Sequence, residues 1–591
     1  MRVPVRVWLA VASATVLVLG AACPTAAAGP KTNHFGANRW IVVAKSDQDF
    51  SALRSDIKAA GGRILNEVPD TGMFVVSGGS GIRNLTSDSH VSSVAADHVE
   101  QVVPPEGDGS KVKPFKLHTP AAAHSSMIPD PAFAMPGLMW NVNRINAPLA
   151  WKKSDGSQAV TVGVADTGLD FTHPELAPQV VHVEDFTGLE GTPTLCQQID
   201  PADNMSDADW AAFYGGPATT DWNGHGSWIG GNIAAALDGL GVNGIAPNVK
   251  LVALKISQWC GYALDSEILA SFTWAADHGI DVVSISFGGY LDMSDADQAA
   301  IYQQYVKTVQ YDLRKGTLVV AAAGNEHTRV GAGGKVLSHG VLWTPGDTPD
   351  PVNNPIDVYG WYETPGGVPG VVDVSATGNV VNAATKNCTI DPSDYPNFIC
   401  KSKTDAHQPA GQGRQNQLAY YSNYGPRIDF AAPGGARKFN LPAWDGGGTP
   451  GFPITTADGY AAWEDFSITS DWALEIQCYA INSSKFYPDC YSTIQGTSMA
   501  TPHVSAVAAL FASAIPRLRH HPLAIEAAMK ATALRISGNK TAGLSATDTS
   551  NGDLNGVACP TGYCHLGGPA ISDREAYGAG LVNAAGILFY R

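Results

Sequence analysis

The sequence predicts an α/β protein in which helices cover both faces of a mostly parallel sheet, giving three layers. Four segments that are mostly apolar predict strands: residues 158–166, 249–256, 281–286 and 317–322. Strands without polar alternation are covered on both faces, as in a parallel sheet between two helix layers. A helical pattern over residues 265–279 has Ile268, Leu269 and Phe272 on one face. Asp265 is expected to cap this helix.

Composition and charge narrow the classes of function that this chain can have. The chain has 591 residues, 44% hydrophobic and 15% charged, with a net charge of −17. This length is ample for a large buried core. No basic stripe appears, so nucleic acid is not expected as a partner. Beyond the N-terminus, no stretch is long and apolar enough to span a bilayer.

Residues 1–28 have the pattern of a secretory signal peptide. Arg2 and Arg6 give the positive start, residues 7–22 are mostly apolar, and small residues precede Gly29. A membrane anchor is the alternative, but the apolar run is short for one. Cys23 also allows a lipoprotein signal, although Gly20 stands where such signals usually have Leu. The mature protein is expected to be secreted, extracellular and free of the membrane.

A small α+β unit is predicted over residues 29–104. Its elements follow the order β-α-β-β-α-β: a strand at 40–43, a helix at 49–60, strands at 63–68 and 72–76, a weak helix and a strand at 91–95. Residues 105–137 are linker-like, because they are rich in Pro, Gly and Ser without periodicity. The large domain spans 138–591, interrupted by surface insertions at 185–221, 326–369, 382–417 and 434–491.

The string Gln-Gly-Thr-Ser-Met-Ala-Thr-Pro-His-Val, residues 495–504, places Ser498 before an apolar helix pattern at 504–512. A helix N-terminus offers unpaired N–H groups and a positive dipole end, which favour a developing oxyanion. Pro502 fits the first turn, where no N–H partner is lost. An N-cap serine is the ordinary alternative.

A serine nucleophile needs a neutral base and an acid that orients the base. Asp166 stands at a strand's carboxyl end, followed by Thr-Gly. His225 lies between two glycines, with room for its ring, before a helix pattern at 228–237. Asn325 follows the strand at 317–322 and could donate to an oxyanion. Taken singly, each residue has a structural alternative as a turn or core residue.

These strings, in the order Asp, His, Ser, resemble those of subtilisin-like serine proteases, the subtilases; chymotrypsin-like enzymes and α/β-hydrolases have other orders. The resemblance implies a serine endopeptidase that acts on polypeptides through an acyl-enzyme, without a cofactor for the chemistry. It gives Ser498 the role of nucleophile, His225 of base, Asp166 of orienting acid and Asn325 of oxyanion donor. Ser227 departs from the family's usual Thr. Because His225 must be neutral to accept a proton, neutral to alkaline pH should favour activity.

The unit at 29–104 resembles the ferredoxin-like propeptide of this family. In subtilases the propeptide assists folding and then blocks the active site. The resemblance therefore implies a self-processing zymogen, whose own propeptide is a partner and whose maturation cut lies within or near residues 105–137.

Residues 284–289, Ser-Ile-Ser-Phe-Gly-Gly, resemble the family's substrate-binding strand, whose backbone would pair with an extended peptide. The predicted substrate-binding residues are Ser284, Ser286, Phe287, Gly288, Ala322, Ala323 and Gly324. Their small size leaves room for a sizeable side chain at the cut, and an apolar or aromatic preference is expected. The insertion at 326–369 departs from the family and adds to the pocket wall.

Nine cysteines are present, of which Cys23 falls within the signal. The other eight are an even number in an oxidising compartment, which suggests up to four disulfides. Spacing suggests the pairs Cys388–Cys400, Cys478–Cys490 and Cys559–Cys564, leaving Cys196–Cys260, although 105 pairings are open. Residues 237–242 resemble a shortened calcium loop of the family, so structural calcium is an expectation without a legible ligand set.

Two rival functions stay open. One is a narrow-specificity processing protease with a single partner substrate, which the long insertions favour. The other is a subtilase-fold binding protein whose site the insertions block. Four catalytic residue types in the family's strings argue against the second, because a scaffold requires none of them.

Overall fold

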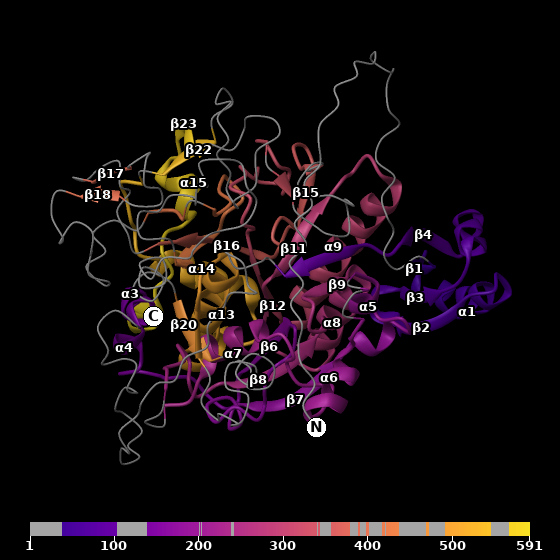
Figure 1. The fold of residues 1–591 in the computed structure, drawn as a ribbon, viewed down its shortest axis with the longest axis horizontal. Helices are drawn as coiled ribbons and strands as arrows, with labels where there is room; N and C mark the ends of the chain where they lie inside the picture. Colours follow the sequence, from indigo (N-terminus) through magenta and orange to yellow (C-terminus); the bar gives the residue numbers. More distant parts are fainter. Residues whose placement is uncertain are drawn as a thin grey trace, which may run out of the picture.

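The computed structural model describes residues 38–102, 139–199, 201, 204–237, 241–339, 341–342, 356–378, 388–390, 398–400, 417–419, 421–435, 468–471, 491–539, 541–544 and 566–590. Their centre is a seven-stranded sheet of order β19-β16-β12-β10-β6-β8-β7, in which every pairing is parallel (Figure 1). The strands are β6 (Thr161–Asp166), β7 (Val180–Asp185), β8 (Lys250–Lys255), β10 (Val282–Ile285), β12 (Leu318–Ala322), β16 (Val372–Thr377) and β19 (Phe430–Pro433). The four strands predicted from apolar runs are β6, β8, β10 and β12, which lie side by side.

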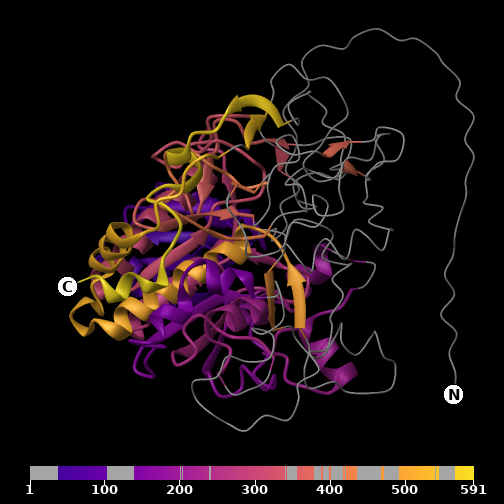
Figure 2. The same cartoon turned by 90° about the vertical axis from the view of Figure 1, so that its left-hand side faces the viewer.

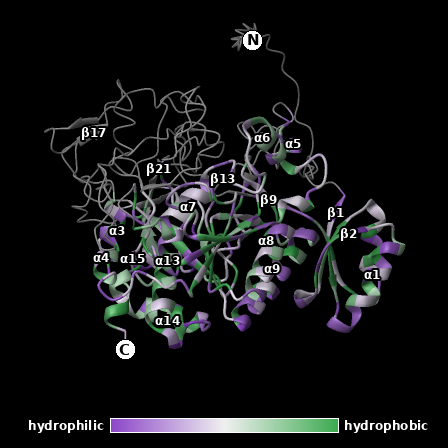
Figure 3. Ribbon diagram, turned by 90° about the horizontal axis from the view of Figure 1, so that it is seen from below, coloured by the Kyte–Doolittle hydropathy of each residue, from purple (hydrophilic) through white to green (hydrophobic). Residues whose placement is uncertain are grey.

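Helices cover both faces of this sheet. One layer holds α7 (His225–Ala234), α13 (Thr497–Ala514) and α14 (Pro522–Thr532), and the other holds α8 (Asp265–Asp277) and α9 (Ala296–Lys315). Alternate residues of one strand enter different cores: Leu318 and Val320 pack on the α13 side, Val319 and Ala321 on the α8 side. Figure 3 shows the strands as largely hydrophobic between the helices. The predicted three-layer fold is confirmed, and its two cores explain why the strands lack polar alternation.

Two helices begin earlier than the apolar pattern predicts. α13 begins at Thr497 and α7 at His225, so Ser498 and His225 lie in first turns. The expectation that Pro502 lies in the first turn is wrong, since it is the sixth residue of α13. Proline has no N–H for the carbonyl four residues earlier, and the Ser286 hydroxyl donates to that Ser498 carbonyl instead, at 3.0 Å.

The α8 helix begins at Asp265, with Leu264 as its N-cap. The prediction of Asp265 as the cap itself is therefore off by one residue. The Asp265 carboxylate accepts a hydrogen bond from the Tyr305 hydroxyl at 2.5 Å, while Glu267 accepts from the Leu264 N–H at 2.9 Å. The carboxylate at the third helical residue therefore does the capping.

The N-terminal unit (indigo in Figure 1) is a separate antiparallel sheet of order β2-β3-β1-β4 with its own core. Its elements are β1 (Arg39–Ala44), α1 (Phe50–Ala59), β2 (Arg63–Val68), β3 (Met73–Ser77), the 3₁₀ helix η3 (Ser80–Ser87) and β4 (Val91–Ala96). The predicted β-α-β-β-α-β order is confirmed, and the weak second helix takes 3₁₀ form. Figure 3 shows this unit beside α8 and α9.

A strand that follows this unit joins it to the large domain. β5 (Val99–Val102) lies antiparallel between β9 (Tyr262–Leu264) and β11 (Phe287–Leu291), in a sheet of order β15-β11-β5-β9 that also holds β15 (Tyr362–Thr364). A buried arginine adds to the junction: Arg39 donates to the Asp97 carboxylate at 2.9 Å and to the Ser266 hydroxyl at 2.8 Å. The unit is thus held by both main-chain and side-chain bonds.

Shorter elements complete the described structure. They are α3 (Trp140–Arg144), α4 (Ala147–Ala150), α5 (Leu195–Ile199), α6 (Asp207–Tyr214), α15 (Asp573–Tyr577), β13 (Val341–Leu342), β14 (Ile356–Asp357), β17 (Cys388–Ile390), β18 (Phe398–Cys400), β20 (Ile468–Asp471), β21 (Tyr491–Ile494), β22 (Ala542–Leu544) and β23 (Leu566–Ala570). The insertion at 185–221, expected to be aperiodic, thus carries α5 and α6. The C-terminal residues (yellow in Figure 2) lie beside the orange helices α13 and α14. None of the helices in the described ranges combines the length and apolarity needed to cross a membrane.

One predicted disulfide is present: Cys196 and Cys260 are bonded, tying α5 to the loop before β9. β17 and β18 pair with Cys388 opposite Cys400, and their bond stays a prediction. Cys478, Cys490, Cys559 and Cys564 lie outside the described residues, as do the signal at 1–28 and the linker at 105–137.

Candidate active site

The predicted catalytic residues come from the carboxyl edge of the parallel sheet and from two helix N-termini beside it. Asp166 is the last residue of β6, His225 the first of α7, and Ser498 the second of α13. Asn325 follows β12 by three residues. In open α/β sheets this edge is where sites form.

Asp166 and His225 are in direct contact. His225 Nδ1 lies 2.8 Å from Asp166 Oδ1, and both side chains are buried. The Thr167 N–H donates to the same oxygen at 2.8 Å. A proton on Nδ1 satisfies this geometry and leaves Nε2 as the basic atom. His225 Nε2 is buried and has no hydrogen-bond partner within the described chain, so the structure records no bond there from Ser498.

Asp221, a residue that sequence reasoning missed, organises the turn that presents His225. Its Oδ1 accepts from the Gly224 and Asn223 N–H groups at 2.8 and 2.9 Å and from the Thr167 hydroxyl. Its Oδ2 accepts from both the N–H and the hydroxyl of Ser227, each at 2.8 Å. Either Ser or Thr can supply this hydroxyl, which explains why Ser227 is tolerated. The spacing Asp-x-x-Gly-His-Gly-Ser was the available signal.

The glycine after His225 has a different role from the one predicted. A Cβ on Gly226 would lie 2.1 Å from the Gly168 carbonyl oxygen. Only glycine therefore lets α7 approach the turn after β6 closely enough to bring His225 to Asp166. The sequence suggests room for the imidazole as the reason, but close backbone approach is the observed one.

Ser498 lies between two segments from neighbouring strands. Its Oγ is 3.5 Å from the Ser286 carbonyl oxygen, just beyond β10. Asn325 Oδ1 accepts from the Thr497 N–H at 3.0 Å and from the Thr497 hydroxyl at 2.9 Å. With its oxygen fixed in this way, the amide of Asn325 presents its NH₂ group as donor next to the residue that precedes Ser498.

The predicted substrate-binding strand is paired with the strand that follows the N-terminal unit. Phe287 lies opposite Val102 and Gly288 opposite Gln101. Ser284 is an exception among the predicted residues, because it lies inside β10 between β6 and β12. Its backbone is already paired on both sides, so it cannot pair with a peptide.

The other wall of the predicted substrate site comes from the end of β12 and the residues that follow it. Ala322 closes this strand, and the Ala323 N–H donates to the Val374 carbonyl at 3.1 Å. Gly324 has φ +99, a conformation that favours glycine. Its N–H donates to the Thr497 hydroxyl at 3.2 Å. Gly324 therefore lies beside the start of α13, and the substrate-binding role of Ala322, Ala323 and Gly324 stays a prediction.

A model of the subtilase family matches residues 157–563, more than half of the chain. The chain belongs to the subtilase family. It is accordingly a serine-type endopeptidase, and the predicted family, fold class and enzyme class are confirmed.

Its relatives are moderately similar. Thermitase of Thermoactinomyces vulgaris is 25% identical over 414 residues, 70% of this chain and 93% of thermitase. Fervidolysin of Fervidobacterium pennivorans is 24% identical over 523 residues, 84% of this chain but 55% of fervidolysin. Among solved structures, fervidolysin has a TM-score of 0.52 at 17% identity, covering 93% of this chain and 61% of its own. The epidermin leader peptide processing serine protease EpiP of Staphylococcus aureus has 0.54 at 16%, covering 93% and 97%.

In this subtilase a buried lysine bonds to the main chain next to Asp166 and to the loop before His225. Lys255 ends β8 and is fully buried. Its Nζ donates to the Thr167 carbonyl at 2.5 Å and the Thr220 carbonyl at 3.1 Å, and pairs with Asp207 Oδ2 at 2.7 Å. Lys255 thereby links the turn after Asp166 to the loop before His225. A charged residue closing an apolar strand was the sequence signal.

His503, the histidine of the nucleophile string, has a structural role. His503 Nδ1–H donates to the Met499 carbonyl at 2.8 Å, and Nε2 accepts from Asn141 Nδ2 at 2.9 Å. Burial lowers the pKa of His503 to about 3. Both ring nitrogens are thus engaged, and the ring stays neutral at physiological pH, so His503 is unsuited to act as the base.

This pKa predicts an acid-dependent loss of stability. Unfolded His503 binds a proton below its ordinary value of 6.5, whereas the folded residue does not until about pH 3. The free energy of unfolding is therefore undiminished by His503 above pH 6.5 and falls as the pH drops below this value. The loss amounts to roughly 5 kcal/mol between pH 6.5 and 3. His503→Gln is expected to flatten the unfolding free energy between pH 6.5 and 4, measured by urea denaturation. Parallel curves for the two proteins would contradict the assignment.

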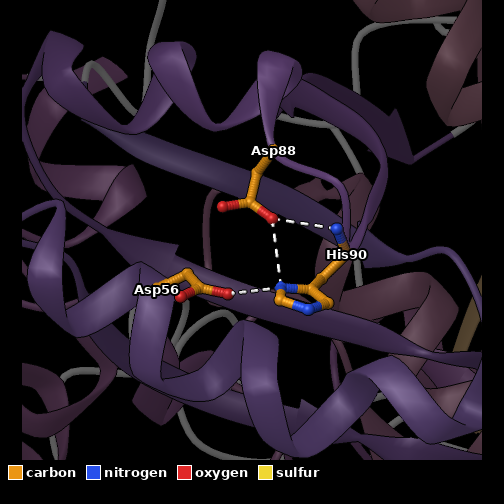
Figure 4. A group of neighbouring side chains, drawn as sticks. All are labelled: Asp56, Asp88 and His90. Atoms are coloured by element: carbon orange, nitrogen blue, oxygen red, sulfur yellow. Dashed lines mark hydrogen bonds and ion pairs between the residues drawn. The ribbon is translucent and has the colours of Figure 1, made fainter.

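Two groups of histidine and carboxylate side chains in the described ranges have metal-like spacing. In the N-terminal unit, His90 Nδ1 lies 2.9 Å from Asp56 Oδ2 and 3.2 Å from Asp88 Oδ1 (Figure 4). All three side chains are partly exposed, and hydrogen bonding to Asp56 raises the pKa of His90, as in an ordinary ion pair. The second group is His98, Glu100 and Asp265.

Neither group falls in the loop at 237–242, and residues 238–240 of that loop lie outside the described ranges. Calcium therefore stays an expectation from the family. Serine-protease chemistry of this kind needs no cofactor.

Proposed function

We propose that this subtilase is a secreted serine endopeptidase, made as a self-processing zymogen, in which Asp166, His225 and Ser498 form the catalytic triad. The observation that carries the proposal is the 2.8 Å contact between His225 Nδ1 and Asp166 Oδ1. It lies at the N-terminus of α7, which packs against the helix that bears Ser498.

In the proposed mechanism His225 Nε2 takes the proton of the Ser498 hydroxyl as the oxygen attacks the peptide carbonyl. Asp166 stabilises the imidazolium that forms. The oxyanion accepts from the Asn325 amide and the Ser498 N–H, aided by the positive end of α13. His225 then gives its proton to the leaving amine. In the second half of the reaction His225 takes a proton from water, which attacks the acyl carbonyl. His225 then returns this proton to Ser498 as the acyl-enzyme bond breaks.

Residues 29–104 are proposed to be the propeptide, after a signal at 1–28 and before a maturation region at 105–137 and the peptidase domain at 138–591. The support is that β5 already occupies the edge of β11 with which a substrate strand would pair. A chain segment bonded there competes directly with substrate. The N-terminal unit would therefore inhibit the enzyme until it is cut and released.

Asn325→Ala is expected to lower kcat by about 10²–10³ with little change in KM, because the amide contacts the oxyanion in the transition state only. Steady-state hydrolysis of a chromogenic peptide measures both constants. Unfolding by heat should be compared, since the alanine also loses the bonds from Thr497. A kcat within threefold of wild type would show that Asn325 is only a turn residue.

Incubation of the purified protein with casein tests the proposed function. Cleavage of casein, with release of a fragment of about a hundred residues from the N-terminus, is expected. EpiP is by its name a leader peptide processing protease, and the likeness in fold favours a narrow-specificity enzyme as the second candidate. That candidate predicts cleavage of the chain's own N-terminal region but not of casein. A blocked binding protein predicts neither cleavage.

A further inference from the structure

Two carboxylates beneath the predicted substrate strand lack hydrogen-bond partners. Glu363 in β15 is 2% exposed and Asp373 in β16 is fully buried. All four of their carboxylate oxygens are without a hydrogen bond in the described structure. Burying a carboxylate in this way is costly unless a cation or donor is supplied.

Glu363 faces the same side of the sheet as the substrate strand's pocket residues. Alternate positions of an extended strand share a face, so Ser286, Gly288 and Tyr290 form one row. Glu363 lies directly opposite Tyr290 in the β11–β15 register and projects to that face. The Tyr290 hydroxyl donates to Glu326 Oε2 at 2.5 Å. Gly288 contributes no side chain to this row, because a Cβ there would lie 2.5 Å from the Thr364 carbonyl oxygen.

The surroundings of Gly324 and Gly366 place these carboxylates beside the segment that follows β12, on the other side of the substrate site. A Cβ on Gly324 would lie 2.7 Å from Glu326 Oε2 and 2.9 Å from the Tyr290 hydroxyl. A Cβ on Gly366 would lie 2.5 Å from Glu363 Oε1, 3.0 Å from Asp373 Oδ1 and 3.1 Å from the Ala322 carbonyl. The carboxylates therefore lie below the segment that leads from Ala322 to Asn325.

The register between β5 and β11 indicates which residue of a bound peptide would lie nearest Ser498. Gly288 pairs with Gln101 and Phe287 with Val102, antiparallel. A peptide that continues this register places its next residue opposite Ser286. The Ser286 carbonyl oxygen is 3.5 Å from Ser498 Oγ. That residue is consequently the one whose carbonyl Ser498 would attack, and its side chain would enter between the two walls.

The cation beside this cluster, Arg427, is shared between these carboxylates and other acceptors. Arg427 pairs with Asp429 at 2.7 Å and donates to the carbonyls of Gly366 and Val371 at 2.5 and 2.6 Å. One guanidinium thus serves several acceptors, whereas Glu326, Glu363 and Asp373 are three carboxylates. Burial raises the pKa of Glu363 well above its usual range and that of Asp373 to about 7.

We infer that Glu363, with Glu326 and Asp373, forms an anionic subsite that binds a Lys or Arg side chain immediately before the scissile bond; this rests on the proposed peptidase function. The long aliphatic stems of Lys and Arg pack along the small-residue walls and carry the charged group to the floor. The subsite replaces the apolar or aromatic preference expected from small residues alone.

The test uses fluorogenic peptides that differ only at the residue before the cut: Lys, Arg, Leu or Phe. Wild type is expected to favour Lys and Arg by tenfold or more in kcat/KM, and Glu363→Gln to lose at least tenfold on these two while retaining Leu and Phe hydrolysis. Glu326→Gln serves as a second variant should Glu363→Gln not fold. Glu184→Gln, a partly exposed carboxylate in β7, is the matched control and should keep the wild-type preference.

Three results would overturn the inference. Preferred cleavage after Leu or Phe, unchanged in Glu363→Gln, would refute the subsite and leave the proposed function intact. A chelator that lowers the melting temperature of wild type but not of Glu363→Gln would assign the carboxylates to a divalent cation instead. Hydrolysis of none of the peptides would contradict the proposed function as well.

Discussion

Ser498→Ala is expected to abolish turnover and to leave the N-terminal unit attached to the chain. The hydroxyl is the atom that attacks, and no neighbouring group can replace it. In subtilisin, a member of the same family, loss of the nucleophile lowers kcat by about 10⁶, and a fall of that order is expected here. Hydrolysis of a chromogenic peptide gives the rate, and the intact mass of the secreted chain shows whether processing occurred.

Ser505→Ala is the matched control for this change. Ser505 is a buried serine on the same helix, and its hydroxyl donates to the Thr501 carbonyl at 3.2 Å. It should process and turn over like wild type. A Ser498→Ala protein that still matures by an intramolecular cut would show that another residue is the nucleophile.

Asp166→Asn is expected to reduce kcat by about 10⁴ while the fold is retained. The carboxylate is fully buried and 2.8 Å from the imidazole, so its charge stabilises the imidazolium formed in the transition state. A neutral amide of the same shape cannot do this. It can still accept the Thr167 N–H, which holds the turn. Kinetics at several pH values, with circular dichroism as a check on folding, measures the effect.

A rate within tenfold of wild type would contradict the role of Asp166. The contact with His225 would then serve only to pack the ring. Thr172→Val offers a comparison near the same turn, because the Thr172 hydroxyl bonds to the Asp170 carboxylate rather than to Asp166. That variant should affect stability more than rate.

The parallel sheet could be predicted because its central strands are apolar on both faces. β6, β8, β10 and β12 each feed two cores, and this burial removes polar alternation from the sequence. Asp166 and His225 could be predicted as neighbours because their strings resemble those of the subtilases and stand at a strand end and a helix start. The sequence predicts the start of α13 too late, at residue 504 instead of Thr497. The first turns of this helix bury hydroxyl residues, which in a sequence are more typical of a loop.

Lys255, Glu363 and Asp373 could not be assigned roles from the sequence. Their surroundings are assembled from segments far apart in the chain: Lys255 meets Asp207 from the insertion at 185–221. Glu363 lies in the insertion at 326–369, which has no periodicity to place it. The β5–β11 register likewise requires the topology, because nothing local to Val99–Val102 specifies its partner.

The most direct test of the proposed triad is to locate the adduct of a fluorophosphonate probe by mass spectrometry. Such probes label a serine only when a base has activated it. The expected result is a single adduct on Ser498, in a chain that has lost its N-terminal unit, and none in His225→Ala. An adduct on another serine, or an unlabelled protein that nevertheless hydrolyses peptides, would contradict the account.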